Sequence, residues 1–145
     1  MTNTEKIIEA LVYMEWHLKE CISSNEIAAE IGMSTRYFRR LFKQTTGFSV
    51  STYLLKRRLS EALKELVDSP KELVRIAYEY QFTCYNRFVR MFYKQFQVQP
   101  YKIYEGQSIS KYPVQETIIY DVMRKHSIPR TVELSANELK LYCGI

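Results

Sequence analysis

The sequence predicts a mainly α-helical fold, followed by a short C-terminal extension in which two β-strands are expected. The 145 residues include only four Gly and four Pro, and the hydrophobic share of 46% and the charged share of 26% are those of an ordinary globular protein. Apolar residues recur at steps of three and four along most of the chain, which is typical of amphipathic helices. Polar residues suited to capping a helix precede several of these stretches.

The first three helices are each marked by such a signal. Thr2 and Glu5 form a capping box before an apolar stripe that runs from Ile7 to Leu18. Residues 23–26 form a second capping box, which opens a short helix that Gly32 ends. Ser34 then caps a third helix, which ends at Gly47 and has Phe38, Leu41 and Phe42 on its buried face.

The later helices are predicted in the same way. A long helix from about Ser49 to Val67 carries one apolar stripe, as expected of a connector between two smaller groups of helices. The stretch Ser69-Pro70-Lys71-Glu72 combines a cap, a proline at the first helical position and a capping-box Glu. Thr83 is expected to cap the next helix, and Pro100 closes that part and permits one short helix over residues 101–104.

Two of these helix pairs form an internal repeat. Ile27, Ala28, Ile31, Gly32, Met33 and Ser34 correspond to Ile76, Ala77, Tyr80, Gln81, Phe82 and Thr83 at an offset of 49 residues, and Phe38 and Phe42 correspond to Phe88 and Phe92 at an offset of 50. Each pair has a small Ala where two helices cross, a short turn, a polar cap and a second helix with a basic outer face. These are the parts of a helix-turn-helix, predicted over residues 23–47 and 70–100.

The charge pattern follows the repeat. Residues 1–33 hold two Lys and six Glu, whereas residues 34–60 hold seven basic side chains and no acid. Residues 80–104 hold four basic side chains and again no acid. The sequence therefore predicts two surfaces that face an anion such as nucleic acid.

The chemistry of DNA recognition predicts roles for fifteen residues of these two surfaces. An α-helix fits the major groove, where the base edges differ in their donors and acceptors, and a bidentate contact discriminates by about 1–3 kcal/mol. The residues predicted to read bases are Arg36, Tyr37, Arg39, Arg40, Tyr85, Asn86, Arg87 and Arg90. Those predicted to contact phosphates are Ser34, Thr35, Lys43, Arg57, Arg58, Thr83 and Lys94.

From about Ile7 to Tyr104 the chain resembles the AraC/XylS family of bacterial transcription regulators, in particular the MarA/SoxS/Rob type. The resemblance rests on residues 27–34, on residues 38–43 with Gly47, and on residues 76–100. It implies seven helices, with two helix-turn-helix units joined by a long central helix. It also implies that residues 36, 39 and 40 lie on the first recognition helix and residues 85, 86, 87 and 90 on the second. One departure is Gln81, which stands where the family usually has Gly, so the second unit is expected to differ in rigidity or angle.

Other classes of function receive no support from the sequence. Cys21, Cys84 and Cys143 lack the spacing of a zinc site, and we interpret them as reduced thiols, two of them in the core. His17 and His126 are isolated, and the chain has neither a phosphate-binding glycine loop nor a nucleophile elbow, so no metal, cofactor or enzymatic activity is expected. No signal peptide or membrane span is expected either, which predicts a cytoplasmic protein.

Residues 1–105 are thus predicted to be the DNA-binding domain and residues 106–145 an extension of unknown role. Gln115 to Lys125 could be helical or extended, and residues 131–134 and 138–143 alternate like two strands. The predicted function is a sequence-specific transcription regulator, an activator, that inserts both recognition helices into successive major grooves of promoter DNA, about 34 Å apart. RNA polymerase and, through the extension, a second copy of the chain are further candidate partners. The alternative is a protein-interaction module of the same fold that sequesters a regulator or RNA polymerase.

Overall fold

The computed structural model describes residues 2–68 and 72–126, which form seven α-helices and one short 3-10 helix. Within those residues no strand occurs, and the prediction of a mainly helical fold is confirmed. The two strands predicted between residues 131 and 143 lie outside the described residues.

The helices are grouped in two units. Unit 1 contains residues 2–17, 22–53 and 117–126 of the described chain, and unit 2 contains residues 18–21, 54–68 and 72–116. The long helix α4 (Val50–Asp68) begins in unit 1 and continues into unit 2. Residues 106–126, predicted to belong to a separate extension, are shared between the two units.

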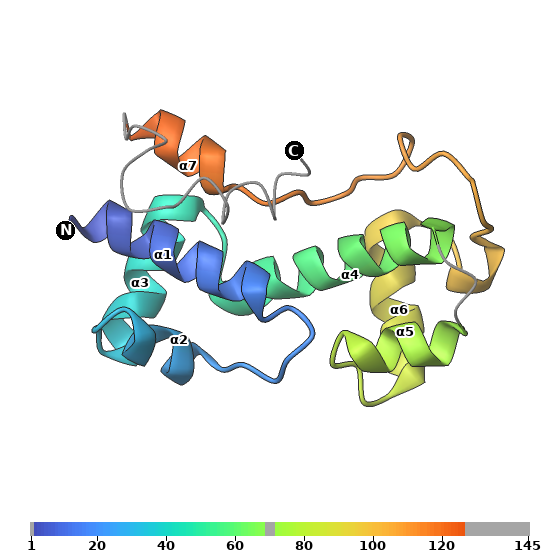
Figure 1. Ribbon diagram of the computed structural model, residues 1–145, viewed down its shortest axis with the longest axis horizontal. Helices are drawn as coiled ribbons and strands as arrows, with labels where there is room; N and C mark the ends of the chain where they lie inside the picture. The colour runs from blue at the N-terminus through green and yellow to red at the C-terminus, as the bar shows by residue number, and fades with distance from the viewer. Residues whose placement is uncertain (1, 69–71, 127–145) are drawn as a thin grey trace. The chain divides into compact units, whose positions relative to one another are not determined.

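Unit 1 begins with the helices α1 (Asn3–Trp16), α2 (Ser24–Glu30) and α3 (Thr35–Thr46) (Figure 1). The Thr2 capping box is confirmed, with both of its hydrogen bonds present. The Ser34 hydroxyl accepts from the backbone N–H of Tyr37, as predicted. The Ser23 hydroxyl accepts from the N–H of Glu26, which is the serine half of the capping box predicted at residues 23–26. Gly47 ends α3 in the left-handed conformation, with φ of 83°.

The core of unit 1 is built from the apolar stripes of these helices. Ile7, Leu11, Phe38, Phe42 and Tyr53 are fully buried. The last helix of the described chain, α7 (Ile119–Lys125), packs against α1 and buries the side chains of Ile119, Val122 and Met123. Only the end of the Gln115–Lys125 segment is therefore helical.

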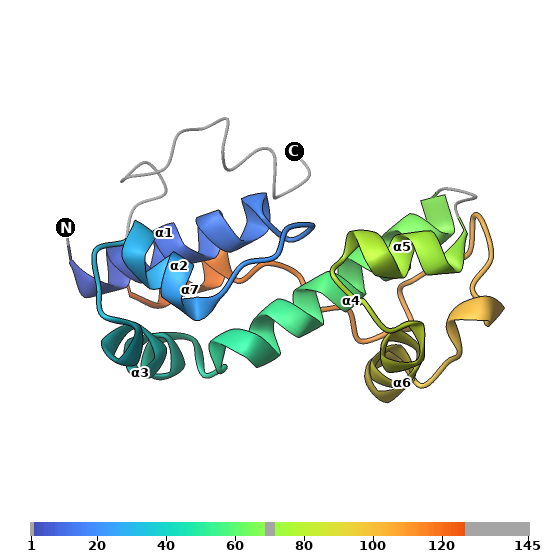
Figure 2. The same cartoon turned by 90° about the horizontal axis from the view of Figure 1, so that it is seen from below.

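Unit 2 holds the rest of α4, then α5 (Leu73–Glu79), α6 (Tyr85–Phe96) and the 3-10 helix η1 (Pro100–Lys102) (Figure 2). Its core includes Leu59, Leu63 and Ala77 together with the phenylalanine rings on the buried face of α6. The ring centroids of Phe88 and Phe92 are 5.5 Å apart, and those of Phe92 and Phe96 are 4.8 Å apart.

Helix starts in unit 2 differ from those predicted. Glu72 has an extended backbone, with ψ of 139°, and it precedes α5, which begins at Leu73. A capping-box Glu is the third residue of its helix, so Glu72 cannot have that role. Ser69, Pro70 and Lys71 lie outside the described residues. The prediction that Thr83 caps α6 is wrong, because the extra residue in this turn moves the cap position to Cys84, whose side chain makes no capping hydrogen bond.

The cysteines also differ from the prediction. Cys21 and Cys84 are both exposed free thiols rather than core residues, and Cys143 lies outside the described residues.

Candidate DNA-binding surface

The turn between α2 and α3 has the geometry of a helix-turn-helix. Ala28 is buried where the two helices cross. Gly32 takes the left-handed conformation, with φ of 71°, and its N–H donates to the Ala29 carbonyl at 3.2 Å. The N–H of Met33 donates to the Ala28 carbonyl at 2.9 Å, which turns the chain sharply into α3.

The turn between α5 and α6 repeats this geometry at an offset of 49 residues. Ala77 is buried, and the N–H of Phe82 donates to the Ala77 carbonyl at 3.0 Å. The N–H of Gln81 donates to the Tyr78 carbonyl at 3.0 Å. Gln81 is left-handed, with φ of 70°, a conformation that costs about 1–2 kcal/mol for a residue with a Cβ atom. The repeat predicted from the sequence is thus a repeat of hydrogen bonds and backbone angles.

The helix α3 presents its predicted basic face to solvent. Arg36, Arg39, Arg40 and Lys43 are exposed, opposite the buried Phe38 and Phe42. Tyr37 is half-buried, and its hydroxyl accepts from the Asn3 side chain at 2.8 Å. The Arg40 guanidinium lies over the Tyr37 ring, 5.4 Å from its centroid. Tyr37 thus lies beside Arg40 on this face of α3.

The helix α6 presents a smaller basic face. Asn86, Arg87, Arg90 and Lys94 are exposed, opposite the buried phenylalanines. Tyr85 is half-buried, and partial burial raises the pKa of its phenol, which keeps the hydroxyl a neutral donor. The Arg87 guanidinium lies 5.6 Å from the centroid of the Phe82 ring in the preceding turn. In each unit an arginine of this face thus lies near an aromatic ring, which comes from the same helix in unit 1 and from the preceding turn in unit 2.

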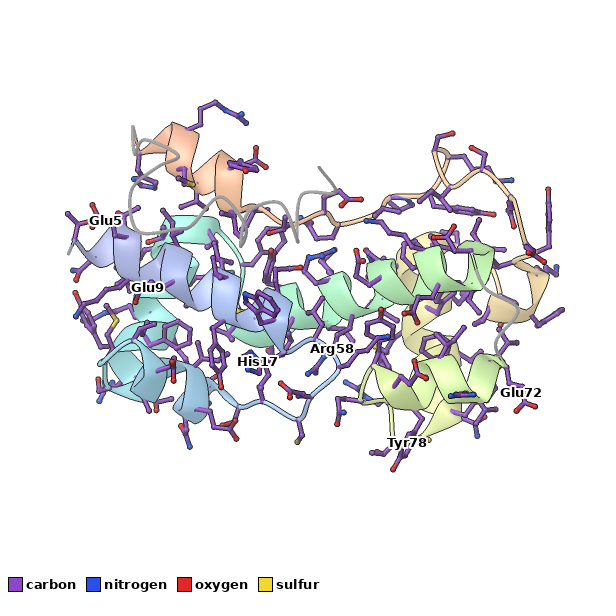
Figure 3. The ribbon with its side chains drawn as sticks, in the orientation of Figure 1. Glu5, Glu9, His17, Arg58, Glu72 and Tyr78 are labelled. Carbon is purple, nitrogen blue, oxygen red and sulfur yellow. The ribbon has the colours of Figure 1, made fainter. Side chains whose placement is uncertain are left out.

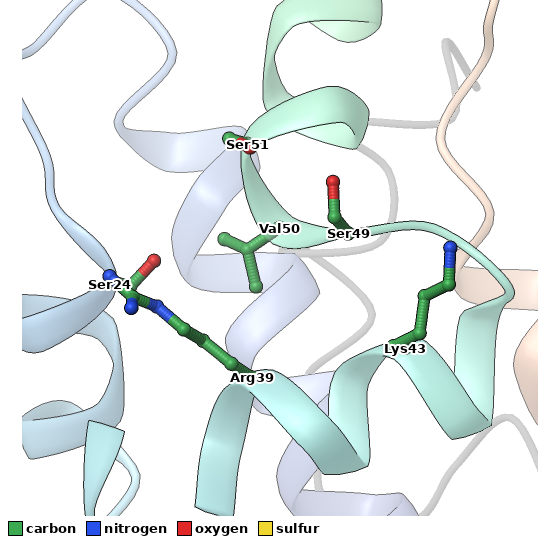
Figure 4. Close-up of a pocket in the computed structure, with 6 residues that line it drawn as sticks. All are labelled: Ser24, Arg39, Lys43, Ser49, Val50 and Ser51. Carbon is green, nitrogen blue, oxygen red and sulfur yellow. The ribbon is translucent and has the colours of Figure 1, made fainter. Parts of the chain in front are cut away.

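An open cavity of about 400 Å³ lies beside the basic face of α3. It is lined by Ser24, Arg39, Lys43, Ser49, Val50 and Ser51. Figure 4 shows Arg39 and Lys43 extending from α3, with Ser49 to Ser51 at the start of α4. Two cations, three hydroxyls and the positive end of a helix of 19 residues suit a phosphate group.

The serines of this cavity were not among the predicted site residues. Ser49 could have been found from its cap position, because its hydroxyl accepts from the N–H of Thr52. Ser24 and Ser51 come from helices whose approach the sequence does not reveal. Thr35 is half-buried and Thr83 is exposed, so both have a surface that a phosphate could reach.

Two arginines predicted to contact phosphate have other roles in the structure. Arg57 is only 3% exposed, and its guanidinium donates to the Glu61 carboxylate at 3.0 Å and to the Gln115 carbonyl at 2.7 Å. Its burial rules out a phosphate contact, so that prediction is corrected. Arg58, labelled in Figure 3, donates to the backbone carbonyls of Leu18 and Glu20 at 2.8 and 2.7 Å. These two hydrogen bonds give Arg58 a structural role within unit 2.

Two further findings concern other kinds of site. Among the residues that the structure describes, no group of three His, Cys, Asp or Glu side chains could hold a metal ion. None of the described helices is both long and apolar enough to cross a membrane.

Comparison with known proteins agrees with the geometry of both turns. Residues 27–105 match the model of a family described as a helix-turn-helix domain. The crystal structure of an AraC-type transcriptional regulator from Chromobacterium violaceum shares 33% identity, covers 68% of this chain and 88% of its own, and superimposes with a TM-score of 0.64. The chain belongs to the AraC-type helix-turn-helix family. This family consists of transcription regulators with a DNA-binding domain and is not a family of enzymes.

Curated relatives of the chain include the transposon Tn10 TetD protein of Escherichia coli, 35% identical over 98 residues, or 68% of this chain and 71% of TetD. The transcriptional activator AarP of Providencia stuartii is 31% identical over 117 residues, which are 81% of this chain and 80% of AarP. The match to the regulator Rob of Salmonella typhimurium covers only 32% of that longer protein. The resemblance to the AraC/XylS family inferred from the sequence is thus confirmed.

Proposed function

We propose that this protein binds promoter DNA with both of its helix-turn-helix units, α3 and α6 each entering a major groove. The observation that carries the proposal is the repeated turn, since in both units it delivers a helix whose exposed face has basic residues and no acid. Side chains near the start of such a helix reach base edges, and flanking cations and hydroxyls hold the phosphates. If the two grooves are successive, the two contacted elements lie about 10 base pairs apart.

The proposed base-reading residues are polar side chains on the outer face of each helix, near its start. On α3 these are Arg36 and Arg40, with Tyr37 beside them, and on α6 they are Tyr85, Asn86, Arg87 and Arg90. An arginine forms two hydrogen bonds with a guanine edge, and an asparagine does the same with adenine. Arg90 is the sixth residue of α6, as Arg40 is the sixth residue of α3.

The proposed phosphate contacts surround these residues. Ser34, Thr35 and Lys43 serve the first unit, and Thr83 and Lys94 serve the second. We assign Arg39 to this group rather than to base reading, because it lines the cavity with Lys43 and the serines of α2 and α4. One phosphate seated there would fix the register of α3 on the duplex.

We further propose that the protein acts in the cytoplasm as a transcriptional activator that contacts RNA polymerase. The name of AarP, a transcriptional activator similar over most of both chains, supports this direction of regulation. A reporter gene placed behind the bound site should be transcribed more strongly when the protein is present. Reduced transcription would contradict the activator role while leaving DNA binding intact.

We also propose that the chain self-associates through its C-terminal segment. Sedimentation of the full chain would test this proposal.

The experiment that tests the main proposal is selection of bound sequences from a random duplex pool. We expect one site with two elements about 10 base pairs apart. Arg40→Ala and Arg90→Ala should each weaken binding to that site by about 1–3 kcal/mol and relax base preference at one element only. Arg124→Ala is the control, since Arg124 is also an exposed arginine but lies on α7. Equal loss of affinity for random DNA would contradict the base-reading assignment.

A second candidate function is a protein-interaction module that sequesters a regulator or RNA polymerase. It is favoured by two exposed apolar side chains on α5, Val74 at 58% and Tyr78 at 69% exposure; Figure 3 labels Tyr78. The two functions differ in salt dependence, because DNA binding weakens steeply as salt rises and counterions compete for phosphates. Absence of DNA binding even at low salt would favour the interaction module.

A further inference from the structure

Gln81 combines an unfavourable backbone with a specific side-chain contact. It is left-handed at the position where the first unit has Gly32, so its Cβ atom makes the turn less stable than glycine would. Its side-chain amide donates from Nε2 to the backbone carbonyl of Lys19 at 2.8 Å. A glycine at this position could not make that bond.

The segment that receives this bond is itself held firmly within unit 2. Arg58 donates to the carbonyls on either side of Lys19, those of Leu18 and Glu20. The Lys19 ammonium lies 2.8 Å from the Glu65 carboxylate and 3.5 Å from that of Glu79. The hydrogen bond with Glu65 raises the pKa of Lys19 despite partial burial, so the ammonium stays charged. Residues 18–21 are therefore a fixed anchor for the Gln81 amide.

The opposite end of the recognition helix has its own attachment. Near the C-terminal end of α6, the Gln95 amide donates to the Ser60 hydroxyl at 3.1 Å and to the Lys56 carbonyl at 3.4 Å, both on α4. Asn86 lies nine residues earlier, about 13 Å along the helix, so a tilt of about 5° at Gln95 would move it by about 1 Å. A hydrogen bond to a base edge does not tolerate such a displacement.

We propose that Gln81 is a positioning residue for DNA recognition, whose amide fixes the turn before α6 to the Lys19 carbonyl and thereby sets where the start of α6 meets the bases. This inference rests on the proposed function. The inference predicts that glycine at this position, although better suited to the backbone, lowers the affinity and the base discrimination of DNA binding.

The test compares Gln81→Gly with a matched control, Gln97→Gly. Gln97 is the other left-handed glutamine of the described chain, with φ of 59°, and its amide bonds only to the Lys94 carbonyl of its own helix. Both variants relieve backbone strain, but only the first removes a contact with residues 18–21. A third variant, Gln81→Glu, keeps the length of the side chain and presents a carboxylate that cannot donate to a carbonyl.

We expect neither glycine variant to lower the melting temperature. Gln81→Gly and Gln81→Glu should weaken binding to the selected site by about 3- to 10-fold, the range of one lost hydrogen bond. Base discrimination should fall at the element read by α6 and hold at the element read by α3. Gln97→Gly should bind as the wild type does. Wild-type affinity and discrimination in Gln81→Gly would overturn the proposal.

A measurement without DNA separates this inference from the proposed function. Backbone amides of residues 82–87 should exchange hydrogen faster in Gln81→Gly than in the wild type, while those of residues 33–38 keep their rates. Unchanged exchange at residues 82–87 would overturn the anchoring role whether or not DNA is bound. If the wild type selects no DNA sequence, the proposed function fails, and the exchange rates still decide whether Gln81 holds the turn.

Discussion

In unit 1 the chain enters its recognition helix through Gly32 and a serine cap, whereas in unit 2 it does so through Gln81 and a cysteine without a capping bond. The buried parts of the two units are nevertheless alike, with an alanine at the helix crossing and phenylalanines at matching positions. The comparison teaches that the spacing of core residues is enough to repeat the motif. The details of turn and cap can then differ, and they set how firmly each recognition helix is held.

The charged faces differ as well. The first helix exposes three arginines and a lysine, and the second exposes two arginines, a lysine and an asparagine. Because Arg39 and Lys43 also line a cavity with three serines, the first unit has more groups available to phosphate. We therefore attribute most of the salt-dependent affinity to unit 1 and expect unit 2 to contribute more through the angle of its helix.

The largest predicted effect tests whether the two cores are equivalent. Phe42→Ala and Phe92→Ala each remove a fully buried ring and should each cost about 3–5 kcal/mol of the free energy of unfolding. Denaturant titration would measure both. Tyr93→Ala, at a half-exposed ring on α6, is the control and should cost far less. If only one of the two phenylalanine variants lowered the free energy of unfolding, the two cores would not be equivalent.

The features that the sequence predicted correctly are local ones. The caps at Thr2 and Ser34 and the helix ends at Gly32 and Gly47 depend on residues within one turn of the position concerned. The repeat was visible because its core positions recur at a fixed offset. Each of these signals is independent of how distant segments meet.

The features that the sequence did not reveal depend on distant segments or on a single inserted residue. An arginine on a helix is normally exposed, but Arg57 is buried, and it donates to the Glu61 carboxylate four residues along α4 and to the Gln115 carbonyl 58 residues away. Thr83 is the better cap by residue type, yet the longer turn places Cys84 at that position. The cavity beside α3 needs serines from two other helical segments, whose approach to α3 depends on tertiary packing.

A smaller effect is predicted at the helix caps, where the two units differ. Ser34→Ala should cost about 1 kcal/mol, because the N–H of Tyr37 loses its acceptor. Cys84→Ser should instead stabilise α6 by a fraction of that, since Cys84 already has the extended backbone of a cap and serine supplies the oxygen. Thermal unfolding would measure both. If Cys84→Ser gave no gain while Ser34→Ala cost stability, the longer turn would be holding the Cys84 side chain out of reach of α6.

The smallest predicted effect concerns acid. Burial raises the pKa of Glu61, but the charges of Arg57 and Lys64 outweigh it, so the pKa lies below the ordinary 4.5. A carboxylate with a depressed folded-state pKa contributes stability above its unfolded value, and that contribution is lost as the pH falls through the folded pKa. Glu61→Gln should therefore lower the free energy of unfolding by about 0.2–1 kcal/mol at neutral pH and reduce its decline below pH 4.5. Glu30→Gln, at an exposed site on α2, is the control in unit 1. If both variants declined equally with acid, the Arg57–Glu61–Lys64 cluster would contribute to packing alone, and the acid sensitivity assigned to unit 2 would have another source.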